Sequence, residues 1–132
     1  MPTVLIVDDS ESVRISVRAL FEAEPDFTVI GEAVNGLDAI GKAEELLPDL
    51  IVLDLSMPIM NGLEAAETLK SSLPTTPIFV LTAHGGPEVD RAGRAAGVDA
   101  VYSKGDNLQK MVVDARAIFA TSKRKRGAAR GK

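Results

Sequence analysis

The chain contains no cysteine, which excludes disulfide scaffolds, cysteine-ligated zinc sites and thiol catalysis. The absence also fits a reducing compartment. No apolar run approaches the roughly 20 residues that a membrane-spanning helix requires. The first residues, Met1 to Val4, lack the basic region followed by an apolar region that marks a secretory signal peptide. We therefore expect a cytoplasmic protein that does not insert into a membrane.

Acidic residues are missing from the last ten positions, "KRKRGAARGK", which carry six Lys or Arg. Residues 1–122 hold nine Lys or Arg against 19 Asp or Glu, so this body has a net charge of −10. We expect one domain over residues 1–122 and a flexible basic tail over 123–132. A basic segment can bind nucleic-acid phosphates, so a nucleic-acid-binding module is an alternative. Because no aromatic residue accompanies the tail and the body is acidic, we expect a solvated tail and no nucleic-acid partner.

Short apolar runs and helical patterns alternate along the chain. Three runs are continuous and rich in Val, Ile and Leu, as is typical of parallel strands buried on both faces. The predicted strands are Val4–Val7, Leu50–Leu53, Ile78–Leu81, Ala100–Tyr102 and a weaker run, Phe27–Ile30, near a sheet edge. Apolar residues at helical spacing follow each run, and Ser10, Asn61, Pro87 and Asn107 provide helix-start signals. The order is strand then helix five times, which predicts an α/β domain with helices on both faces of a parallel sheet.

Charged and polar residues stand where the predicted strands end. Asp8 and Asp9 follow the first run, Asp54 follows Leu53, Thr82 follows Leu81, and Lys104 comes after the last run. Sites in open parallel sheets form beyond the carboxyl ends of the strands, so these groups are expected to converge. Three carboxylates brought together repel one another unless a cation intervenes. Mg²⁺ fits, because it binds through one or two carboxylates together with waters and phosphate oxygens.

A carboxylate, Mg²⁺ and a lysine together suit phosphoryl transfer. A carboxylate can attack phosphorus to form an aspartyl phosphate, while metal and lysine neutralise the phosphoryl oxygens. Asp54 stands alone at its strand end and is the predicted nucleophile, whereas Asp8 and Asp9 are placed as metal ligands. Each residue taken singly has an ordinary interpretation, such as a helix cap or a solvated lysine. Their coincidence at one sheet edge favours the site.

Four motifs now resemble the receiver domain of two-component response regulators. They are "VLIVDDS" at 4–10, "DLIVLDLSMPIMNG" at 49–62, "PIFVLTA" at 77–83 and "VYSK" at 101–104. Each is weak singly, but four in order at this spacing are specific, and the resemblance covers roughly residues 3–121. It implies a flavodoxin-like (βα)5 fold with strand order 2-1-3-4-5.

The resemblance also implies roles for the acidic residues. Asp54 would accept a phosphoryl group from a sensor histidine kinase or a phosphotransfer protein. Asp9 and Asp54 would ligate Mg²⁺, Asp8 would help to hold it through water, and Ser56 would offer its backbone carbonyl. The chain would then be a phosphorylation-dependent signalling switch rather than an enzyme with a substrate of its own.

Further roles implied by the resemblance concern the output. Thr82 and Lys104 would stabilise the phosphoryl group, and Thr82 and Tyr102 would form the switch. The face over residues 87–103 would contact an output partner that the sequence does not name. The family commonly has proline after the lysine, often in a cis peptide bond. Here Gly105 follows, which predicts a trans bond and a looser loop.

Other readings are less well supported by the residues. A Mg²⁺-dependent phosphatase of the haloacid dehalogenase kind needs a second acid two positions after its nucleophile, where this chain has Ser56. Dinucleotide and P-loop sites are excluded because G-x-G-x-x-G and Gly-Lys-Ser/Thr are missing. His84, the single histidine, is either an exposed loop residue or a residue that tunes the lifetime of the aspartyl phosphate. We expect a stand-alone receiver that is a monomer or a weak dimer.

Overall fold

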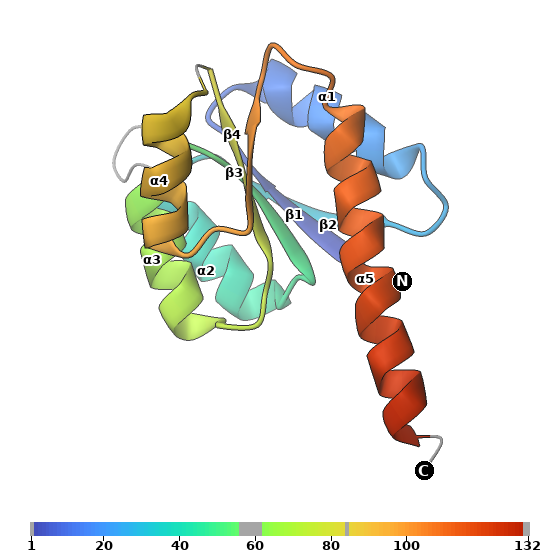
Figure 1. Ribbon diagram of the computed structural model, residues 1–132. Coiled ribbons are helices and arrows are strands. Elements are labelled where there is room, and N and C mark those ends of the chain that lie inside the picture. The colour runs from blue at the N-terminus through green and yellow to red at the C-terminus, as the bar shows by residue number, and fades with distance from the viewer. Residues whose placement is uncertain (1, 56–61, 84, 131–132) are drawn as a thin grey trace.

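The computed structural model describes residues 2–55, 62–83 and 85–130, with side chains up to residue 120. Five strands and five helices alternate along these ranges (Figure 1). The strands are β1 (Thr3–Val7), β2 (Thr28–Ala33), β3 (Leu50–Asp54), β4 (Ile78–Thr82) and β5 (Ala100–Ser103). The helices are α1 (Glu11–Glu22), α2 (Gly36–Leu46), α3 (Gly62–Ser72), α4 (Pro87–Ala96) and α5 (Gln109–Arg130).

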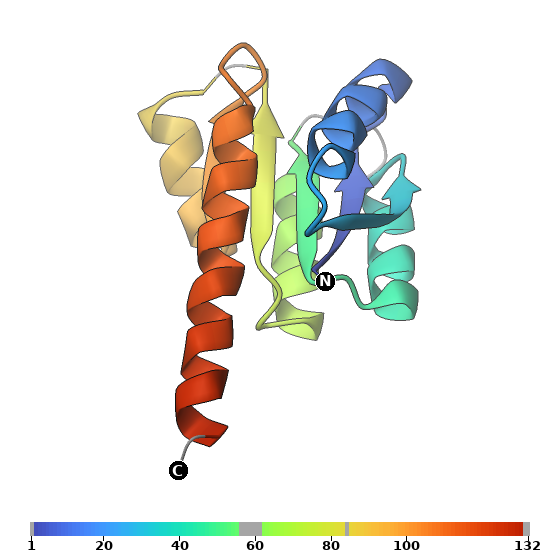
Figure 2. The same cartoon turned by 90° about the vertical axis from the view of Figure 1, so that its right-hand side faces the viewer.

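The strands form one parallel sheet in the order β2-β1-β3-β4-β5. This order confirms the predicted flavodoxin-like fold, and it confirms the prediction that the weak second run lies at a sheet edge. The helices cover both faces, with α1 and α5 on one side and α2, α3 and α4 on the other (Figures 1 and 2). The carboxyl ends of β1, β3 and β4 are therefore neighbours.

Each face of the sheet packs against its own hydrophobic core. Successive side chains of a strand point to opposite faces, so Leu5 and Val7 of β1 join the core under α2, α3 and α4. Val4 and Ile6 join the core under α1 and α5. All residues of β3 are buried, which explains its continuous apolar sequence. The two cores hold the central strands rigidly, so their carboxyl ends are fixed in space.

Side-chain caps define several helix starts. Ser10 accepts a hydrogen bond from the N–H of Val13, and Pro87 occupies the first turn of α4, as predicted. Asn35 caps α2 by accepting from the N–H of Asp38 at 2.8 Å, a cap that the sequence analysis missed. The predicted cap Asn61 lies outside the described residues.

The last helix crosses the predicted boundary at residue 122. The sequence predicted a flexible tail from residue 123, whereas α5 continues as a helix to Arg130 (Figure 2). Lys, Arg and Ala are strong helix formers, and basic residues near a helix C-terminus interact favourably with its dipole. The mobility of this segment stays a prediction. Among the described helices, none is both long and apolar enough to cross a membrane.

Candidate functional site

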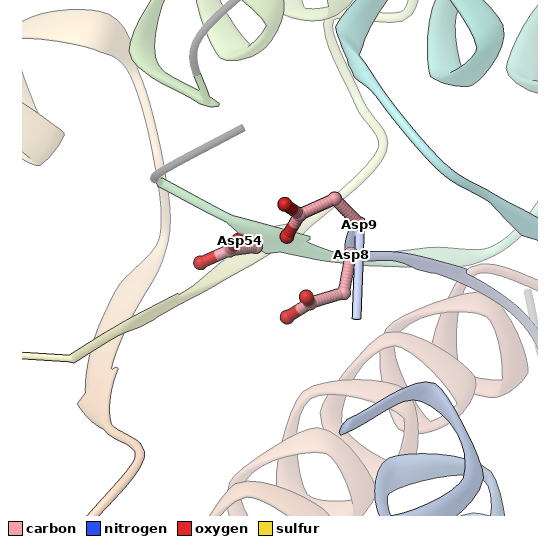
Figure 3. A group of neighbouring side chains, drawn as sticks. All are labelled: Asp8, Asp9 and Asp54. Carbon is pink, nitrogen blue, oxygen red and sulfur yellow. The ribbon is translucent and has the colours of Figure 1, made fainter. Parts of the chain in front are cut away.

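Asp54 and Asp8 lie side by side because the strands that carry them are paired. Asp54 is the last residue of β3, and Asp8 directly follows β1. Val7 of β1 is in register with Leu53 of β3. Asp8 is 1% exposed and Asp54 is 2% exposed, whereas Asp9 is exposed. Figure 3 shows the three aspartate side chains extending to the same side of the strand ends.

The three carboxyl groups form a donor set for a hard divalent cation. One oxygen from each of Asp8, Asp9 and Asp54 lies within 4.8 Å of the other two. Oδ2 of Asp8 is buried and receives no hydrogen bond of acceptable geometry from the described residues, although Lys104 Nζ lies 3.0 Å away as an ion pair. An all-oxygen site with an incompletely satisfied carboxylate suits Mg²⁺. The residues present therefore fit the metal that the resemblance implies.

Lys104 brings a positive charge to the same cluster. Its Nζ lies 3.0 Å from Oδ2 of Asp8 and 3.1 Å from Oδ1 of Asp54. Burial alone lowers the pKa of this ammonium group, but the close contacts with the carboxylates of Asp8 and Asp54, together with their negative charges, outweigh burial and raise the pKa above its ordinary value. Lys104 therefore stays protonated, and its charge offsets part of the repulsion between the two buried carboxylates.

Backbone hydrogen bonds hold the loop that carries Lys104. The N–H of Lys104 donates to the carbonyl of Thr82 at 2.8 Å, and the N–H of Asp106 donates to the carbonyl of Ser103 at 3.0 Å. The peptide bond between Lys104 and Gly105 is trans, as are the other described peptide bonds. The contact with Thr82 continues the pairing of β4 with β5, so it fixes the point at which Lys104 leaves the sheet without help from a proline.

The two predicted switch residues lie on neighbouring strands. Thr82 ends β4 and is 7% exposed. The ring of Tyr102 in β5 is buried against Phe79, with 5.4 Å between ring centroids. The Tyr102 hydroxyl donates to Oδ2 of Asp114 at 2.7 Å. Burial, then this hydrogen bond and the charge of Asp114, raise the pKa of Tyr102 above its ordinary value. No local pattern in the sequence predicts this link between β5 and α5.

Gly62 is a second residue that the sequence analysis did not assign to the site. A Cβ atom added there would lie 2.2 Å from the backbone oxygen of Asp54 and 2.6 Å from Cα of Leu55. The N–H of Gly62 also donates to the carbonyl of Leu55 at 2.9 Å. The start of α3 therefore packs directly on the backbone of the predicted nucleophile. The Asn-Gly pair in the sequence indicated a turn, but a turn signal does not predict that Gly62 packs on the backbone of Asp54.

Two predicted site residues, Ser56 and His84, lie outside the described residues. The predicted metal contact of the Ser56 carbonyl and the predicted effect of His84 on phosphoryl lifetime therefore stay predictions. All residues of the predicted output face, 87–103, are described. This face comprises α4 and β5, beside an open hollow of about 400 Å³ lined by Gly85, Gly86, Asp90, Val101, Ser103 and Asp106.

Residues 4–116 match the family model of the response regulator receiver domain. The chain belongs to this family. Receiver domains are phosphoacceptor signalling switches of two-component systems, so the predicted family, fold and function class are confirmed. The acidic cluster of this receiver domain lies where the family motifs placed it, at the carboxyl ends of β1 and β3.

Similar proteins include longer regulators and enzymes. The receiver domain is 39% identical over 120 residues to a putative transcriptional regulator of Pseudomonas aeruginosa, covering 91% of this chain and 58% of that protein. It is 38% identical over 121 residues to a protein-glutamate methylesterase/protein-glutamine glutaminase of Methanosarcina mazei, covering 86% of this chain and 34% of that protein. A receiver domain can therefore be part of an enzyme.

Solved structures agree with the fold. A two-component response regulator of the LuxR family from Aurantimonas sp. SI85-9A1 superposes with a TM-score of 0.86 at 28% identity, covering 92% of this chain and 86% of that chain.

Proposed function

We propose that Asp54 of this receiver domain accepts a phosphoryl group from the phosphohistidine of a sensor histidine kinase or a phosphotransfer protein. One observation carries the proposal. The Asp54 carboxylate shares a cluster with two further carboxylates and an ammonium group 3.1 Å from its Oδ1. That arrangement has little use in a merely structural turn, because it buries like charges that water would otherwise solvate.

The proposed reaction is a direct displacement at phosphorus. An oxygen of Asp54 attacks the phosphorus, the new O–P bond forms, and the N–P bond to the donor histidine breaks with its electron pair returning to the imidazole. The ammonium group of Lys104, which contacts Asp54 before the reaction, would then pair with the incoming phosphoryl oxygens and stabilise their negative charge. Asp8, Asp9, Asp54 and, by resemblance, the carbonyl of Ser56 would hold Mg²⁺. When bound, this ion neutralises charge on the transferring group.

The proposed output begins at Thr82 and Tyr102. The Thr82 hydroxyl would hydrogen-bond the phosphoryl group, and the resulting rearrangement would reach the ring of Tyr102 and the face over residues 87–103. Tyr102 is the single tyrosine in a chain without tryptophan, so tyrosine emission reports this one position. Beryllofluoride with Mg²⁺ should change that emission in the wild type, less in Thr82→Ala and not in Asp54→Asn. Constant emission while the analogue binds would place the output elsewhere.

The remaining parts of the proposal concern setting and partners. We propose that the protein is cytoplasmic, a reducing compartment in which proteins rarely depend on disulfide bonds. We also propose that it is a monomer or a weak dimer. His84, next to the site in sequence, would tune the lifetime of the aspartyl phosphate. The chain itself would act as a phosphoacceptor, with self-catalysed phosphoryl transfer and dephosphorylation only.

Phosphorylation by a small donor tests the proposed function. Incubation with acetyl phosphate and Mg²⁺ should add the mass of one phosphoryl group, and peptide mapping should place it at Asp54. Asp54→Asn should abolish the adduct. Asp49→Asn is the matched control, because Asp49 precedes the same strand at its opposite end and bonds Thr3 there. An unmodified wild type would refute the proposal, and continuous phosphate release without an adduct would favour the phosphatase alternative.

A further inference from the structure

The guanidinium group of Arg14 touches the backbone of the acidic pair. Arg14 lies in α1 with its side chain 14% exposed. Its Nη1 donates to the backbone carbonyl of Asp8 at 2.7 Å, and its Nε donates to Oε1 of Glu32 in β2 at 2.9 Å. We propose that Arg14, oriented by Glu32, is a positioning residue that holds Asp8 and Asp9 in the geometry required for divalent cation binding. This inference rests on the metal site in the proposed function.

The carbonyl that Arg14 holds belongs to the peptide unit between Asp8 and Asp9. A peptide unit is planar, so fixing its oxygen restricts the orientation of the plane from which Asp9 projects. The neighbouring contacts fix the rest of Asp8. Its N–H donates to the carbonyl of Ala33 at 3.1 Å, and its Oδ1 accepts from the N–H of Ser10 at 2.9 Å. Asp9 lies beyond the end of β1, so strand pairing does not hold its backbone. The hydrogen bond from Arg14 to the Asp8 carbonyl restrains the backbone at this point instead.

Glu32 gives the guanidinium group its direction. The guanidinium is a rigid planar fork, so an ion pair at Nε sets where Nη1 points. Glu32 is held in turn, because its carboxylate also pairs with Arg18 and its backbone carbonyl accepts from Lys42. Arg14 and Arg18 thus share one carboxylate, but Arg14 alone of the two has a described contact with Asp8. This difference supplies a matched control.

If Arg14 positions the metal ligands, its removal should weaken Mg²⁺ binding, whereas its charge alone predicts that removal strengthens binding. Removing a positive charge near three carboxylates makes the cluster more negative, which by itself strengthens cation binding. Loss of a group that orients metal ligands weakens it, typically by 10-fold to 100-fold. Weaker Mg²⁺ binding in a variant that lacks the Arg14 charge therefore cannot come from charge alone.

The test compares Arg14→Gln with Arg18→Gln in the full chain. Thermal unfolding is followed while Mg²⁺ is added, and the rise in melting temperature gives the apparent dissociation constant for Mg²⁺. Arg14→Gln should bind Mg²⁺ about 10-fold more weakly than the wild type. Arg18→Gln, which loses the same charge and the same Glu32 partner, should bind equally well or more tightly. Phosphorylation of Asp54 by acetyl phosphate should slow in the same order.

Two further variants separate the geometry of the guanidinium group from its charge and test the role of Glu32. Arg14→Lys retains the charge but cannot reproduce the fork, so it should also bind Mg²⁺ more weakly, and it replaces Arg14→Gln if that variant does not fold. Glu32→Gln should give an intermediate loss. Equal Mg²⁺ dissociation constants in the wild type, Arg14→Gln and Arg14→Lys would overturn the inference while leaving the metal site intact. A wild type that shows no response to Mg²⁺ would instead refute the metal site itself.

Discussion

The two hydrophobic cores bury apolar side chains, whereas the carboxyl edge of the sheet buries charged ones. The cores contain apolar side chains from both faces of β1, β3 and β4, with almost no exposure. The edge buries Asp8 and Asp54 within one cluster, and one ammonium group contacts both of them. Burying apolar area stabilises a fold, whereas clustering carboxylates destabilises it. The cores therefore supply the stability of the fold, which offsets the cost of burying the predicted phosphoacceptor Asp54 beside Asp8.

The backbone contact at Gly62 joins the two regions, so we expect its disruption to have the largest effect. Gly62→Ala forces a methyl group against the backbone oxygen of Asp54, which cannot rotate away. Overpacking of this kind should cost about 3 kcal/mol of unfolding free energy and slow phosphorylation of Asp54. Urea unfolding and acetyl phosphate labelling measure the two effects.

Gly41→Ala is the matched control for Gly62→Ala. Gly41 lies within α2, and a Cβ atom there would meet nothing within 4 Å. Alanine should stabilise this helix by about 0.5–1 kcal/mol. The two glycine substitutions should therefore change the unfolding free energy in opposite directions. If both variants gained stability, the close packing of α3 on the β3 end would be wrong.

Removing the hydrogen bond between Tyr102 and Asp114 should lower the unfolding free energy by an intermediate amount. Asp114→Ala removes the acceptor and should cost about 1–2 kcal/mol. Because burial and Asp114 raise the pKa of Tyr102, the bond contributes fully below about pH 10, the ordinary tyrosine pKa. The contribution is lost as the pH rises through the folded-state pKa.

Near-ultraviolet absorbance of tyrosinate follows that ionisation in a chain with one tyrosine. In folded protein, Asp114→Ala should ionise Tyr102 at a lower pH than the wild type. Asp106→Ala, an exposed change in the preceding loop, should leave the titration unchanged. Coincident titrations of the wild type and Asp114→Ala would remove Asp114 as the partner of Tyr102.

The smallest effect is expected far from the acidic edge, at Leu47. Leu47, the C-cap residue that follows α2, adopts the left-handed conformation with φ of 50° and is 64% exposed. Glycine adopts this conformation without steric strain, so Leu47→Gly should stabilise the fold by about 0.5–1 kcal/mol. Leu46→Gly, one residue earlier in the helix, should destabilise it by about 1 kcal/mol or more. Equal losses in chemical unfolding of both variants would contradict this account.

The strands, their order and the acidic cluster could be predicted from the sequence. Continuous apolar runs marked the buried strands, and a parallel sheet brings strand ends together, so Asp8, Asp9 and Asp54 could be placed before the structure. Lys104 was placed by the same argument and by the resemblance. The strands and the convergence of their ends were predicted from local patterns and one topological rule. The strand order was implied by the family resemblance, and the observed order β2-β1-β3-β4-β5 confirms it.

The contacts that support the site could not be predicted in the same way. Arg14 and Asp114 looked like ordinary charged positions on helices, because their partners lie on other elements and depend on how those elements pack. Gly62 gave only a turn signal, and its contact with the Asp54 backbone appears only in three dimensions. The helical continuation of α5 to Arg130 was not predicted, because the run of basic residues after residue 122 indicated a solvated tail, although Lys, Arg and Ala favour helices.

We propose that Asp8, Asp9 and Asp54 form a divalent cation site whose three carboxylates repel one another when no metal is bound. The most direct test of this proposal is the unfolding free energy of the wild type and Asp54→Asn, measured without metal and then with increasing Mg²⁺. Without metal, Asp54→Asn should be more stable by about 1 kcal/mol, because one buried like charge is gone. With Mg²⁺, the wild type should gain more stability than the variant and close this gap. A less stable Asp54→Asn in metal-free buffer, together with a wild type unaffected by Mg²⁺, would contradict the account.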